Sequence, residues 1–320
     1  MAQPEQDKLK DQVRDFWNEQ SCDTQVAKAS KFSHDYFEEI ERFRYFDQPF
    51  IHSFAQFSRY HGKRVVEVGF GAGTDFIGWL RAGARASGID LTQEALDSLR
   101  QRIAVYRLPE PETIQVGDAE NLPFDSNQFD LGYSFGVLHH TPNTEKAVAE
   151  LIRVVRPGGE IKMMLYNRHS IYAVNLWIKH ALLRGQPWKS LRGVLWHNME
   201  SVGTKGYTRS ELERLLSSLP LEQIQIHTEI TAADYLSASA FPPLNLFFRT
   251  CLRLAGSRFG WHPSHYVERV NAPGKRARAA NARGDSRRAK GVLMTGNRWG
   301  FFHCISARKA ERPSLEPAPI

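Results

Sequence analysis

A glycine-rich turn between two apolar segments constrains the fold of this chain most strongly. Residues 64–68 are a short β-branched run typical of a buried strand, and residues 75–82 have the spacing of a helix. Between these segments glycine stands at alternate positions, as Gly69, Gly71 and Gly73. Glycine has no Cβ, so the backbone here can adopt positive φ and a ligand can lie directly against it. The pattern predicts a strand, a ligand-binding turn and a helix, in that order.

The spacing of the turn differs from that of dinucleotide-binding proteins. Their pattern is Gly-x-Gly-x-x-Gly, whereas here the third glycine comes one residue early and Thr74 takes its expected place. Glu67 lies two residues before the first glycine, where a carboxylate suits an ammonium group better than a pyrophosphate. Asp90 ends the next apolar run and can accept hydrogen bonds from ribose hydroxyls. The turn and its acids therefore indicate a site for a small nucleoside.

Four pieces of the sequence resemble one enzyme family in order and spacing. They are Glu67–Gly73, Asp90, Gly117–Phe124, and Phe129–His140 followed by Arg156–Gly159. This set resembles the class I S-adenosylmethionine (SAM) dependent methyltransferases, and looks closest to the bacterial group that includes the ubiquinone/menaquinone biosynthesis methyltransferases. The resemblance covers roughly residues 60 to 166. It implies an α/β fold with a doubly wound, mostly parallel seven-stranded sheet, N-terminal helices and an insertion before the last strand.

The resemblance also implies which residues bind the cofactor, SAM. Glu67 and the backbone of Gly69, Gly71 and Gly73 are expected to hold its amino-acid portion, and Asp90 its ribose hydroxyls. The adenine is expected to contact Leu91 with its face, and Asp118 and Ala119 with its amine. Ser134 is expected to lie at the cofactor as well. For Asp118, a role as a turn residue after the third strand is the alternative.

The candidate catalytic residues are a pair of histidines after the fourth strand, His139 and His140. Methyl transfer is an in-line displacement with a neutral leaving group, so positioning the reactants can supply most of the catalysis. A base is needed only where the acceptor must lose a proton, and imidazole titrates in the useful range. His140 is the preferred base, because in related enzymes the second position of this pair more often faces the pocket. A role as a hydrogen-bonded wall residue is the alternative.

The acceptor is expected to be a small or lipid-like molecule methylated on oxygen, nitrogen or carbon. Candidates for contact with it are aromatic residues of the N-terminal helices and polar or aromatic residues beyond the fifth strand: Trp17, Tyr36, Tyr45, Tyr166, Asn167, Arg168, Thr204 and Tyr207. Arg168 could pair with an acidic group of the substrate or be a solvated loop residue. The Asn/Asp-Pro-Pro-Tyr/Phe signature of nucleic-acid amino-methyltransferases is missing, with Ser134 beginning the segment in its place. This disfavours a nucleic-acid acceptor.

Strand and helix patterns alternate along the core, which is typical of a doubly wound sheet. Strands are expected near 64–69, 85–90, 112–117, 129–135, 159–166, 222–230 and 298–308, the last antiparallel, and helices over 75–82, 93–105, 144–155 and 170–183. Thr208 and Glu211 form a capping-box pattern that predicts a further helix start. The expected divisions are an N-terminal helical cap (1–60), a SAM-binding core (61–166), the rest of the catalytic domain with substrate or lid insertions (167–309), and a frayed tail (310–320).

The net charge of +7 is concentrated in one segment. Residues 271–290 hold seven Lys or Arg against one acid, among Ala, Gly and Asn, which is the composition of a solvated loop. Binding of an anionic substrate, a membrane surface or RNA by this segment is the alternative. The insertion around it, 231–297, is expected to form a lid or to pack on the core, with contact to a membrane surface as the alternative. An alternative function follows: an RNA- or anionic-membrane-binding protein that uses a methyltransferase scaffold.

Three distant cysteines predict neither a disulfide framework nor a metal site. The first 15 residues are charged and lack the apolar stretch of a signal peptide, so a cytoplasmic location is expected. The oligomeric state does not follow from the sequence.

Overall fold

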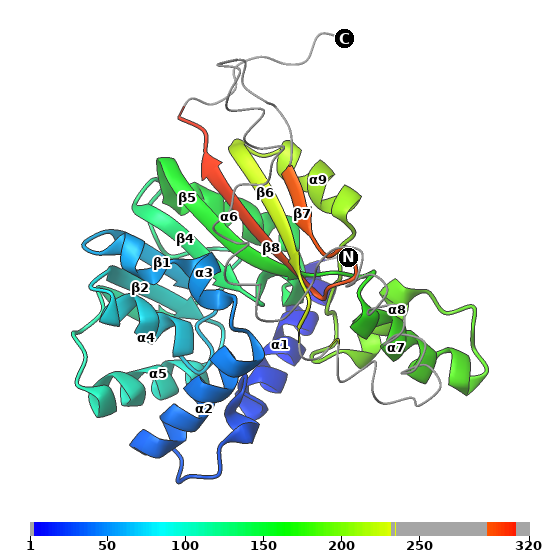
Figure 1. Cartoon of the computed structure of the whole chain (residues 1–320), viewed down its shortest axis with the longest axis horizontal. Helices are drawn as coiled ribbons and strands as arrows, with labels where there is room; N and C mark the ends of the chain where they lie inside the picture. Colours follow the sequence, from blue (N-terminus) through cyan, green and yellow to red (C-terminus); the bar gives the residue numbers. More distant parts are fainter. Residues whose placement is uncertain (1–2, 232–233, 235–292, 312–320) are drawn as a thin grey trace, which may run out of the picture.

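One eight-stranded sheet forms the centre of the protein (Figure 1). The structure is a computed structural model that describes residues 3–231, 234 and 293–311. Within these residues the strand order is β3-β2-β1-β4-β5-β8-β6-β7. The strands are β1 Arg64–Val68, β2 Arg85–Asp90, β3 Thr113–Val116, β4 Phe129–Phe135, β5 Val155–Tyr166, β6 Leu221–Glu229, β7 Leu293–Gly296 and β8 Phe302–Lys309.

The sheet has the predicted topology with one additional strand. β1 to β5 pair in parallel, and β8 inserts antiparallel between β5 and β6. The predicted doubly wound, mostly parallel sheet with an antiparallel last strand is therefore confirmed. The eighth strand, β7, pairs parallel with β6 at the edge. It lies at the end of the stretch expected to be an insertion, and four residues are too few for a recognisable alternation.

Helices cover both faces of this sheet (Figure 1). They are α1 Gln3–Glu19, α2 His34–Asp47, α3 Ile51–Ala55, α4 Thr74–Arg81, α5 Gln93–Tyr106, α6 Thr144–Val154, α7 Ile171–His180, α8 Leu191–Asn198 and α9 Arg209–Ser217. Neighbouring strand residues point to opposite faces: Val65 packs with α3, α4 and α5, whereas Val66 packs with α6 and α9. The two apolar clusters therefore enclose the sheet from both sides.

Two groups of helices lie at the end of the sheet that holds the carboxyl ends of the parallel strands (Figure 1). α1 and α2 belong to the segment expected to form a cap, while α7 and α8 form a hairpin that projects from the body. α3 and α8 were not predicted, since each is short and lacks a complete apolar stripe. The capping box of α9 is present, because Thr208 and Glu211 each bond the other's backbone N–H.

β5 starts earlier than the sequence predicts. Its first residue pairs with Phe129, and the register then jumps so that Leu131 pairs with Glu160. The Arg156–Gly159 turn accounts for the jump, with Gly158 at φ +72°. These residues therefore form an irregularity inside β5, whereas the sequence predicted that the strand would begin after them.

Several expectations concern residues outside the described ranges. The basic segment 271–290, nearly all of the 231–297 insertion and most of the tail are among these. Within the described ranges, the structure contains no helix with both the length and the apolar character required to cross a bilayer.

Candidate functional site

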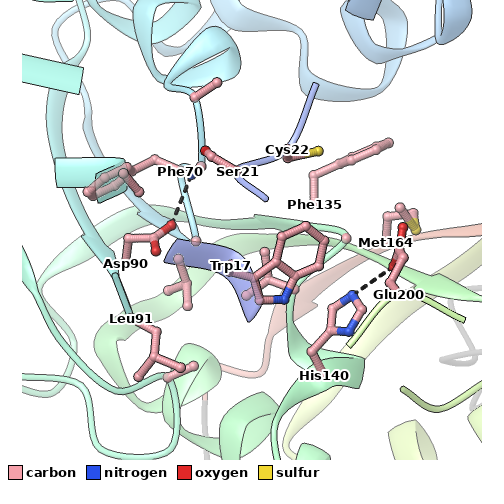
Figure 2. Close-up of a pocket in the computed structure, with 18 of the residues that line it drawn as sticks. Trp17, Ser21, Cys22, Phe70, Asp90, Leu91, Phe135, His140, Met164 and Glu200 are labelled. Atoms are coloured by element: carbon pink, nitrogen blue, oxygen red, sulfur yellow. Dashed lines mark hydrogen bonds and ion pairs between the residues drawn. The ribbon is translucent and has the colours of Figure 1, made fainter. Parts of the chain in front are cut away.

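A cavity of about 440 Å³ opens at the carboxyl ends of β1, β2, β4 and β5 (Figure 2). Residues from α1, α2, the glycine turn and the segments after β2, β3 and β4 line it. The volume lies in the range of ligand sites, and this edge of a doubly wound sheet is where such folds bind ligands. The residues matched by sequence at separate strand ends therefore meet at one cavity.

The glycine turn wraps one end of this cavity. Gly69, Gly71 and Gly73 all adopt positive φ, at +78°, +50° and +78°. A Cβ on Gly69 would lie 2.3 Å from Val137 Cγ2, so a side chain there has no space. Gly69 and Gly71 line the cavity, whereas Gly73 begins α4 and packs against the side chain of Leu99. The backbone is thus shaped to approach a ligand at the first two glycines.

Asp90 holds a fixed carboxylate at the end of β2. Its Oδ2 accepts from the Gly71 N–H at 2.9 Å, and its Oδ1 accepts from the Thr92 N–H and hydroxyl at 3.0 and 2.9 Å. Burial raises the pKa of Asp90, and the hydrogen bonds from Gly71 and Thr92 oppose that shift. A carboxylate held in this way retains lone pairs for ligand hydroxyls.

Glu67 is a buried acid in the same wall. Its Oε2 accepts from Trp79 Nε1–H at 2.8 Å, and its side chain pairs with no cation of the described residues. Burial raises the pKa of Glu67 well above its ordinary value, and the negative charge of nearby Asp75 raises it further. A cationic group brought beside Glu67 would therefore be stabilised by an acid that forms no ion pair with a cation of the described residues.

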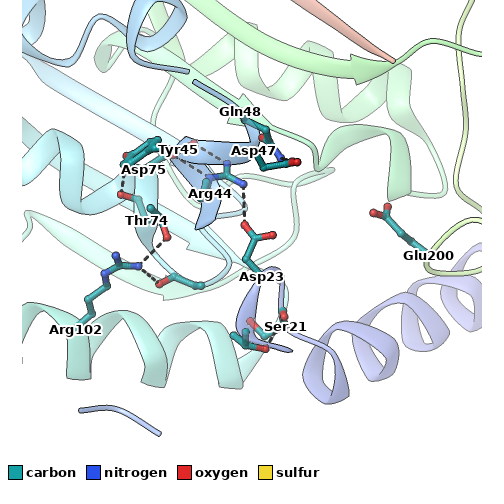
Figure 3. A network of polar contacts seen from close by, with 12 residues as sticks. Ser21, Asp23, Arg44, Tyr45, Asp47, Gln48, Thr74, Asp75, Arg102 and Glu200 are labelled. Atoms are coloured by element: carbon teal, nitrogen blue, oxygen red, sulfur yellow. Dashed lines mark hydrogen bonds and ion pairs between the residues drawn. The ribbon is translucent and has the colours of Figure 1, made fainter. Parts of the chain in front are cut away.

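A buried network fixes the turn from behind (Figure 3). Arg44 of α2 donates to both carboxylate oxygens of Asp75, at 3.1 and 2.8 Å, and lies 3.4 Å from Asp23 Oδ2. The hydroxyl of Tyr133 donates to Asp75 Oδ2 at 2.9 Å. The network ties α2 to the first turn of α4 and to β4.

Arg102 of α5 supports the turn directly (Figure 3). Its fully buried guanidinium donates to the carbonyl of Ala72 at 3.1 Å and to Thr74 Oγ1 at 2.8 Å, and forms an ion pair with Glu41 at 2.9 Å. Arg102 therefore connects the glycine turn to α5, on which it lies, and to α2, which holds Glu41.

The segments after β2 and β3 line the cavity on the side of α1. Leu91 follows β2, and Asp118 and Ala119 follow β3. Lys10 of α1 lies 2.6 Å from Asp118 Oδ2 and 3.3 Å from Glu120 Oε2. Asp118 Oδ1 also accepts from the Glu120 N–H at 2.9 Å. Asp118 thus combines a turn-forming bond with a carboxylate that faces the cavity.

His140 reaches the cavity from the segment after β4 (Figure 2). Its Nδ1 lies 3.0 Å from Thr204 Oγ1 and 3.1 Å from Ser201 Oγ, and its Nε2 lies 3.3 Å from Glu200 Oε2. The Thr204 hydroxyl donates to the Ser201 carbonyl at 2.6 Å, so its oxygen accepts from His140 Nδ1–H. This arrangement directs the buried Nε2 toward Glu200.

His139 is placed differently from its neighbour. Its side chain is fully buried, outside the cavity lining, with its ring centroid 3.8 Å from that of Tyr166. Burial lowers its pKa well below the ordinary value, so the ring is neutral. The candidate base role for His139 is therefore corrected to packing in the wall behind His140.

Beyond the glycine turn the cavity becomes an apolar chamber. Its walls are aromatic and sulfur-containing side chains: Trp17, Phe135, Met164, Tyr166, Tyr172, Met199, Phe301 and Phe302. Polar groups also line the chamber: the Tyr166 hydroxyl donates to Glu200 at 3.0 Å, and the Arg44 guanidinium lies 5.2 Å over the Phe135 ring. The Trp17 ring lies 5.2 Å from that of His140. The chamber thus places the pair of His140 and Glu200 beside an apolar surface.

Two predicted residues of the N-terminal helices lie outside the lining. Tyr36 is buried against Phe37 and neighbouring apolar residues. The Tyr45 hydroxyl donates to the Thr74 carbonyl at 3.3 Å and so supports α4. Both aromatics were expected to face the substrate, but their helical position directs them into packing. Trp17 is the predicted aromatic of this segment that lines the cavity.

Predicted residues beyond β5 are engaged within the protein. The Asn167 side chain donates to the carbonyls of Arg298 and Gly300, and Arg168 forms an ion pair with Glu211 at 2.6 Å. Tyr207 and Arg168 line a second hollow, which shares Pro142 with the first cavity. Thr204 holds His140 instead of facing the chamber, and Tyr166 lines the chamber as expected. Asn167, Arg168, Thr204 and Tyr207, which were expected at the acceptor, thus lie outside the chamber lining, and Asn167, Arg168 and Thr204 make contacts within the protein.

Ser134 is also engaged within the sheet. It is fully buried and its hydroxyl donates to the Val68 carbonyl at 2.9 Å, outside the cavity lining. Its expected place at the cofactor is corrected to a bond between β4 and the end of β1.

Several polar residues of the site were not predicted, among them Lys10, Arg44, Asp75 and Glu200. Each acts through a partner that is far away in sequence, so no local pattern marks it. Of these four residues, Asp75 could most nearly have been predicted from the sequence. It lies in the first turn of the helix after the glycines, and an acid buried there requires a cationic partner.

Comparison with known proteins identifies the domain. Residues 66–163 match a family model described as a methyltransferase domain. The phthiotriol/phenolphthiotriol dimycocerosates methyltransferase of Mycobacterium tuberculosis is 38% identical over 100 residues, which are 31% of this chain and 36% of that protein. The match thus spans about a third of the length of this curated relative.

Two solved structures share the architecture over nearly the whole chain. The geranyl diphosphate C-methyltransferase of Streptomyces coelicolor, crystallised with S-adenosyl-L-homocysteine, aligns with a TM-score of 0.53 at 14% identity, covering 94% of this chain and 98% of that one. The [4+2]-cyclase SpnF aligns with a TM-score of 0.50 at 15% identity, covering 95% and 94%. At such identities these structures show the fold alone.

The fold is therefore that of the class I SAM-dependent methyltransferases, as the sequence resemblance implied. Residues 66–163 match the methyltransferase-domain model, and the expected strand-end motifs lie within or beside this range. The matches do not distinguish the ubiquinone/menaquinone group from others. The cyclase shows that the fold by itself leaves the reaction open.

Proposed function

We propose that the protein is an enzyme that transfers a methyl group from SAM to a small or lipid-like acceptor. The observation that carries this proposal is the charge of the cavity. Among the described residues its lining holds two basic side chains, Lys10 and Arg44, against seven acids: Asp23, Asp47, Glu67, Asp75, Asp90, Asp118 and Glu200. The chain as a whole is basic, with a net charge of +7. An acidic cavity in a basic protein favours a cationic ligand, and SAM carries a sulfonium and an ammonium.

In this proposal each part of the cofactor binds a different group of lining residues. The ammonium lies beside Glu67, with the carboxylate end against the backbone of Gly69 and Gly71. The ribose hydroxyls donate to Asp90. The adenine lies between Leu91 and the segment that holds Asp118 and Ala119, beneath α1. The sulfonium then points toward the apolar chamber.

We infer that the acceptor has an apolar body and a hydroxyl at its reacting end. The aromatic and sulfur-containing walls suit an apolar body, and the pair of His140 and Glu200 suits an acceptor that loses a proton. A lipid-like acceptor is supported by the name of the M. tuberculosis relative.

The chemistry is a displacement with balanced charges. The acceptor oxygen forms a bond to the methyl carbon, while the carbon–sulfur bond breaks and its electron pair stays on the sulfur. The hydroxyl proton passes to His140 Nε2. The resulting imidazolium is stabilised by Glu200 on one side and by the Thr204 oxygen on the other. Positioning by the chamber and proton removal by His140 are the protein's contributions.

Cofactor binding is tested by thermal unfolding with and without S-adenosylhomocysteine. At about 100 times the dissociation constant the ligand should stabilise the fold by roughly 2.7 kcal/mol. Asp90→Ala should abolish this shift, while Asp35→Asn, at an exposed acid of α2, should keep it. The absence of any shift in the wild-type protein would refute the proposal.

Methyl transfer is tested by incubating the protein with methyl-labelled SAM and a cell lipid extract. Label should appear in the organic phase, and S-adenosylhomocysteine should accumulate in equal amount. SAM that binds without being consumed would instead favour a role other than methyl transfer.

The alternative function, a scaffold that binds RNA or anionic membranes through residues 271–290, concerns residues outside the described ranges. It gives no reason for unpaired Glu67 or for Asp90 at the cavity. The acids of the site therefore support the enzyme over the scaffold.

A further inference from the structure

The hairpin of α7 and α8 has an exposed apolar tip. Leu182, Leu183 and Trp188 lie in the connection between the helices, and their side chains are 46%, 60% and 77% exposed. Soluble surfaces seldom expose a tryptophan and two leucines so close together without a partner. The hairpin itself projects from the body beside the sheet (Figure 1).

The tip is a built structure rather than a loose connection. Trp177 Nε1–H donates to the Lys189 carbonyl at 2.6 Å and thereby fastens the connection to α7. Gly185, at φ +67°, reverses the chain, and the Ser190 hydroxyl caps α8 by accepting from the Gly193 N–H at 3.1 Å. The apolar side chains are therefore held outward in the free protein.

The charge around the tip has one sign. Residues 171–198 contain four Lys or Arg and not a single Asp or Glu: Lys179, Arg184, Lys189 and Arg192. All four side chains are exposed. The pKa of His180 is lowered by its partial burial and then by the charges of Arg184, Lys179 and Lys189, which places these cations around one point. The surface thus combines exposed apolar side chains with exposed positive charges.

We propose that the hairpin tip, residues 182–190 with Lys179 and Arg192, docks on an anionic lipid bilayer. Leucine and tryptophan with surrounding Lys and Arg form the pattern of interfacial membrane contacts, in which apolar groups enter the headgroup region and cations meet anionic lipids. RNA could bind the cations through its phosphates, but it has no apolar phase into which Leu182 and Leu183 could insert. The apolar anchors therefore favour the bilayer.

The hairpin also connects this surface to the cavity. Tyr172 in the first turn of α7 and Met199 immediately after α8 both line the apolar chamber. α7 has 10 residues, so the tip lies about 15 Å from that wall. Docking at the tip would hold the chamber near a lipid surface, although the docking itself does not depend on methyl transfer.

The test is sedimentation with vesicles of equal parts phosphatidylglycerol and phosphatidylcholine, compared with phosphatidylcholine alone. The wild-type protein should bind the anionic vesicles and release from them at high salt. Leu183→Ser/Trp188→Ser should weaken binding roughly tenfold or more. Arg184→Gln/Lys189→Gln should weaken it roughly 25-fold, because each cation near the surface contributes about fivefold.

Matched variants keep the outcome interpretable. Phe46→Ser removes an 84% exposed apolar side chain from α2 and should leave vesicle binding unchanged. Thermal midpoints show that each variant is folded. Neutralising the Lys and Arg of 271–290 should leave hairpin-dependent binding in place. The proposal is overturned if the wild type does not bind anionic vesicles, if the tip variants bind as well as the wild type, or if the tip variants lose only RNA binding.

Discussion

His140 Nε2 lies 3.3 Å from Glu200 Oε2, although 60 residues separate the two in sequence. On its other side the imidazole bonds Thr204, and Glu200 in turn accepts from the Tyr166 hydroxyl. Burial raises the pKa of Tyr166 well above its ordinary value, so this hydroxyl remains a donor. The imidazole is thus oriented from both sides at the end of the apolar chamber.

Loss of Glu200 should slow the reaction without loosening the cofactor. In the proposed mechanism His140→Asn should reduce kcat by about 10²–10⁴-fold, as for the removal of a general base. Glu200→Gln should reduce it less, and the double variant should be no slower than His140→Asn, because the two residues act as a unit. Kinetics and calorimetry with S-adenosylhomocysteine check this. A cofactor affinity that falls in parallel with kcat would contradict it.

Glu67→Gln should stabilise the free protein at neutral pH while weakening the cofactor. The pKa of Glu67 is raised in the fold by burial, so folding favours its protonated form. Its contribution to stability is therefore full below the ordinary glutamate pKa of about 4.3 and is lost as pH rises through the raised value. Glutamine removes that loss, but it also removes the partner of the ammonium, which should weaken binding by about tenfold or more.

Thermal midpoints between acidic and neutral pH, with and without S-adenosylhomocysteine, measure both effects of Glu67→Gln. In the wild type, ligand affinity should fall as pH falls, because the ligand requires the ionised acid. Glu213→Gln, at an exposed position of α9, provides the control. A variant less stable than the wild type at neutral pH would disprove the assignment of Glu67 as an uncompensated buried acid.

Arg102→Met should destabilise the fold by about 3–5 kcal/mol, the range observed when one partner of a buried ion pair is removed. The substitution leaves the Ala72 carbonyl without its Arg102 donor and removes one of the two arginines paired with Glu41, which keeps Arg81. Urea unfolding measures the loss. Arg100→Met, at an exposed position of the same helix, should change stability little. Equal effects of the two variants would argue against the network.

Alanine at two glycines separates backbone strain from steric conflict. Gly62 and Gly69 have similar φ of +70° and +78°, but a Cβ on Gly62 meets no atom within 4 Å. Gly62→Ala should therefore show only the left-handed strain of about 1–2 kcal/mol. Gly69→Ala adds the clash with Val137 and should also abolish cofactor binding. Denaturant unfolding and calorimetry compare the two, and equal stability losses would contradict the clash.

The parts of the site predictable from sequence are those that local patterns define. The glycine turn and Asp90 follow from a strand, its turn and the next strand end, so their meeting is a consequence of the parallel sheet. Glu200, Arg44 and Lys10 could not be found in this way, because each reaches the cavity through a contact between distant segments. β7 was missed for a different reason, since four residues at a sheet edge carry too short an alternation.

The predicted acceptor residues show a further limit of sequence patterns. Asn167 and Thr204 are close in sequence to residues that line the cavity, but their side chains point into the protein. Asn167 donates to backbone carbonyls, and Thr204 bonds His140. A pattern locates a strand end but does not fix the direction of a polar side chain beyond it. Supporting residues and contact residues therefore look alike until the chain is folded.

α1 brings Lys10 beside Asp118 and Trp17 beside His140, so one helix contacts both ends of the cavity. In terms of thermodynamic linkage, a helix ordered by one ligand is already in place for the other. Cofactor and acceptor should then raise each other's affinity by the same factor. A substitution that loosens α1 would appear as a loss of this cooperativity, with neither ligand's own contacts touched.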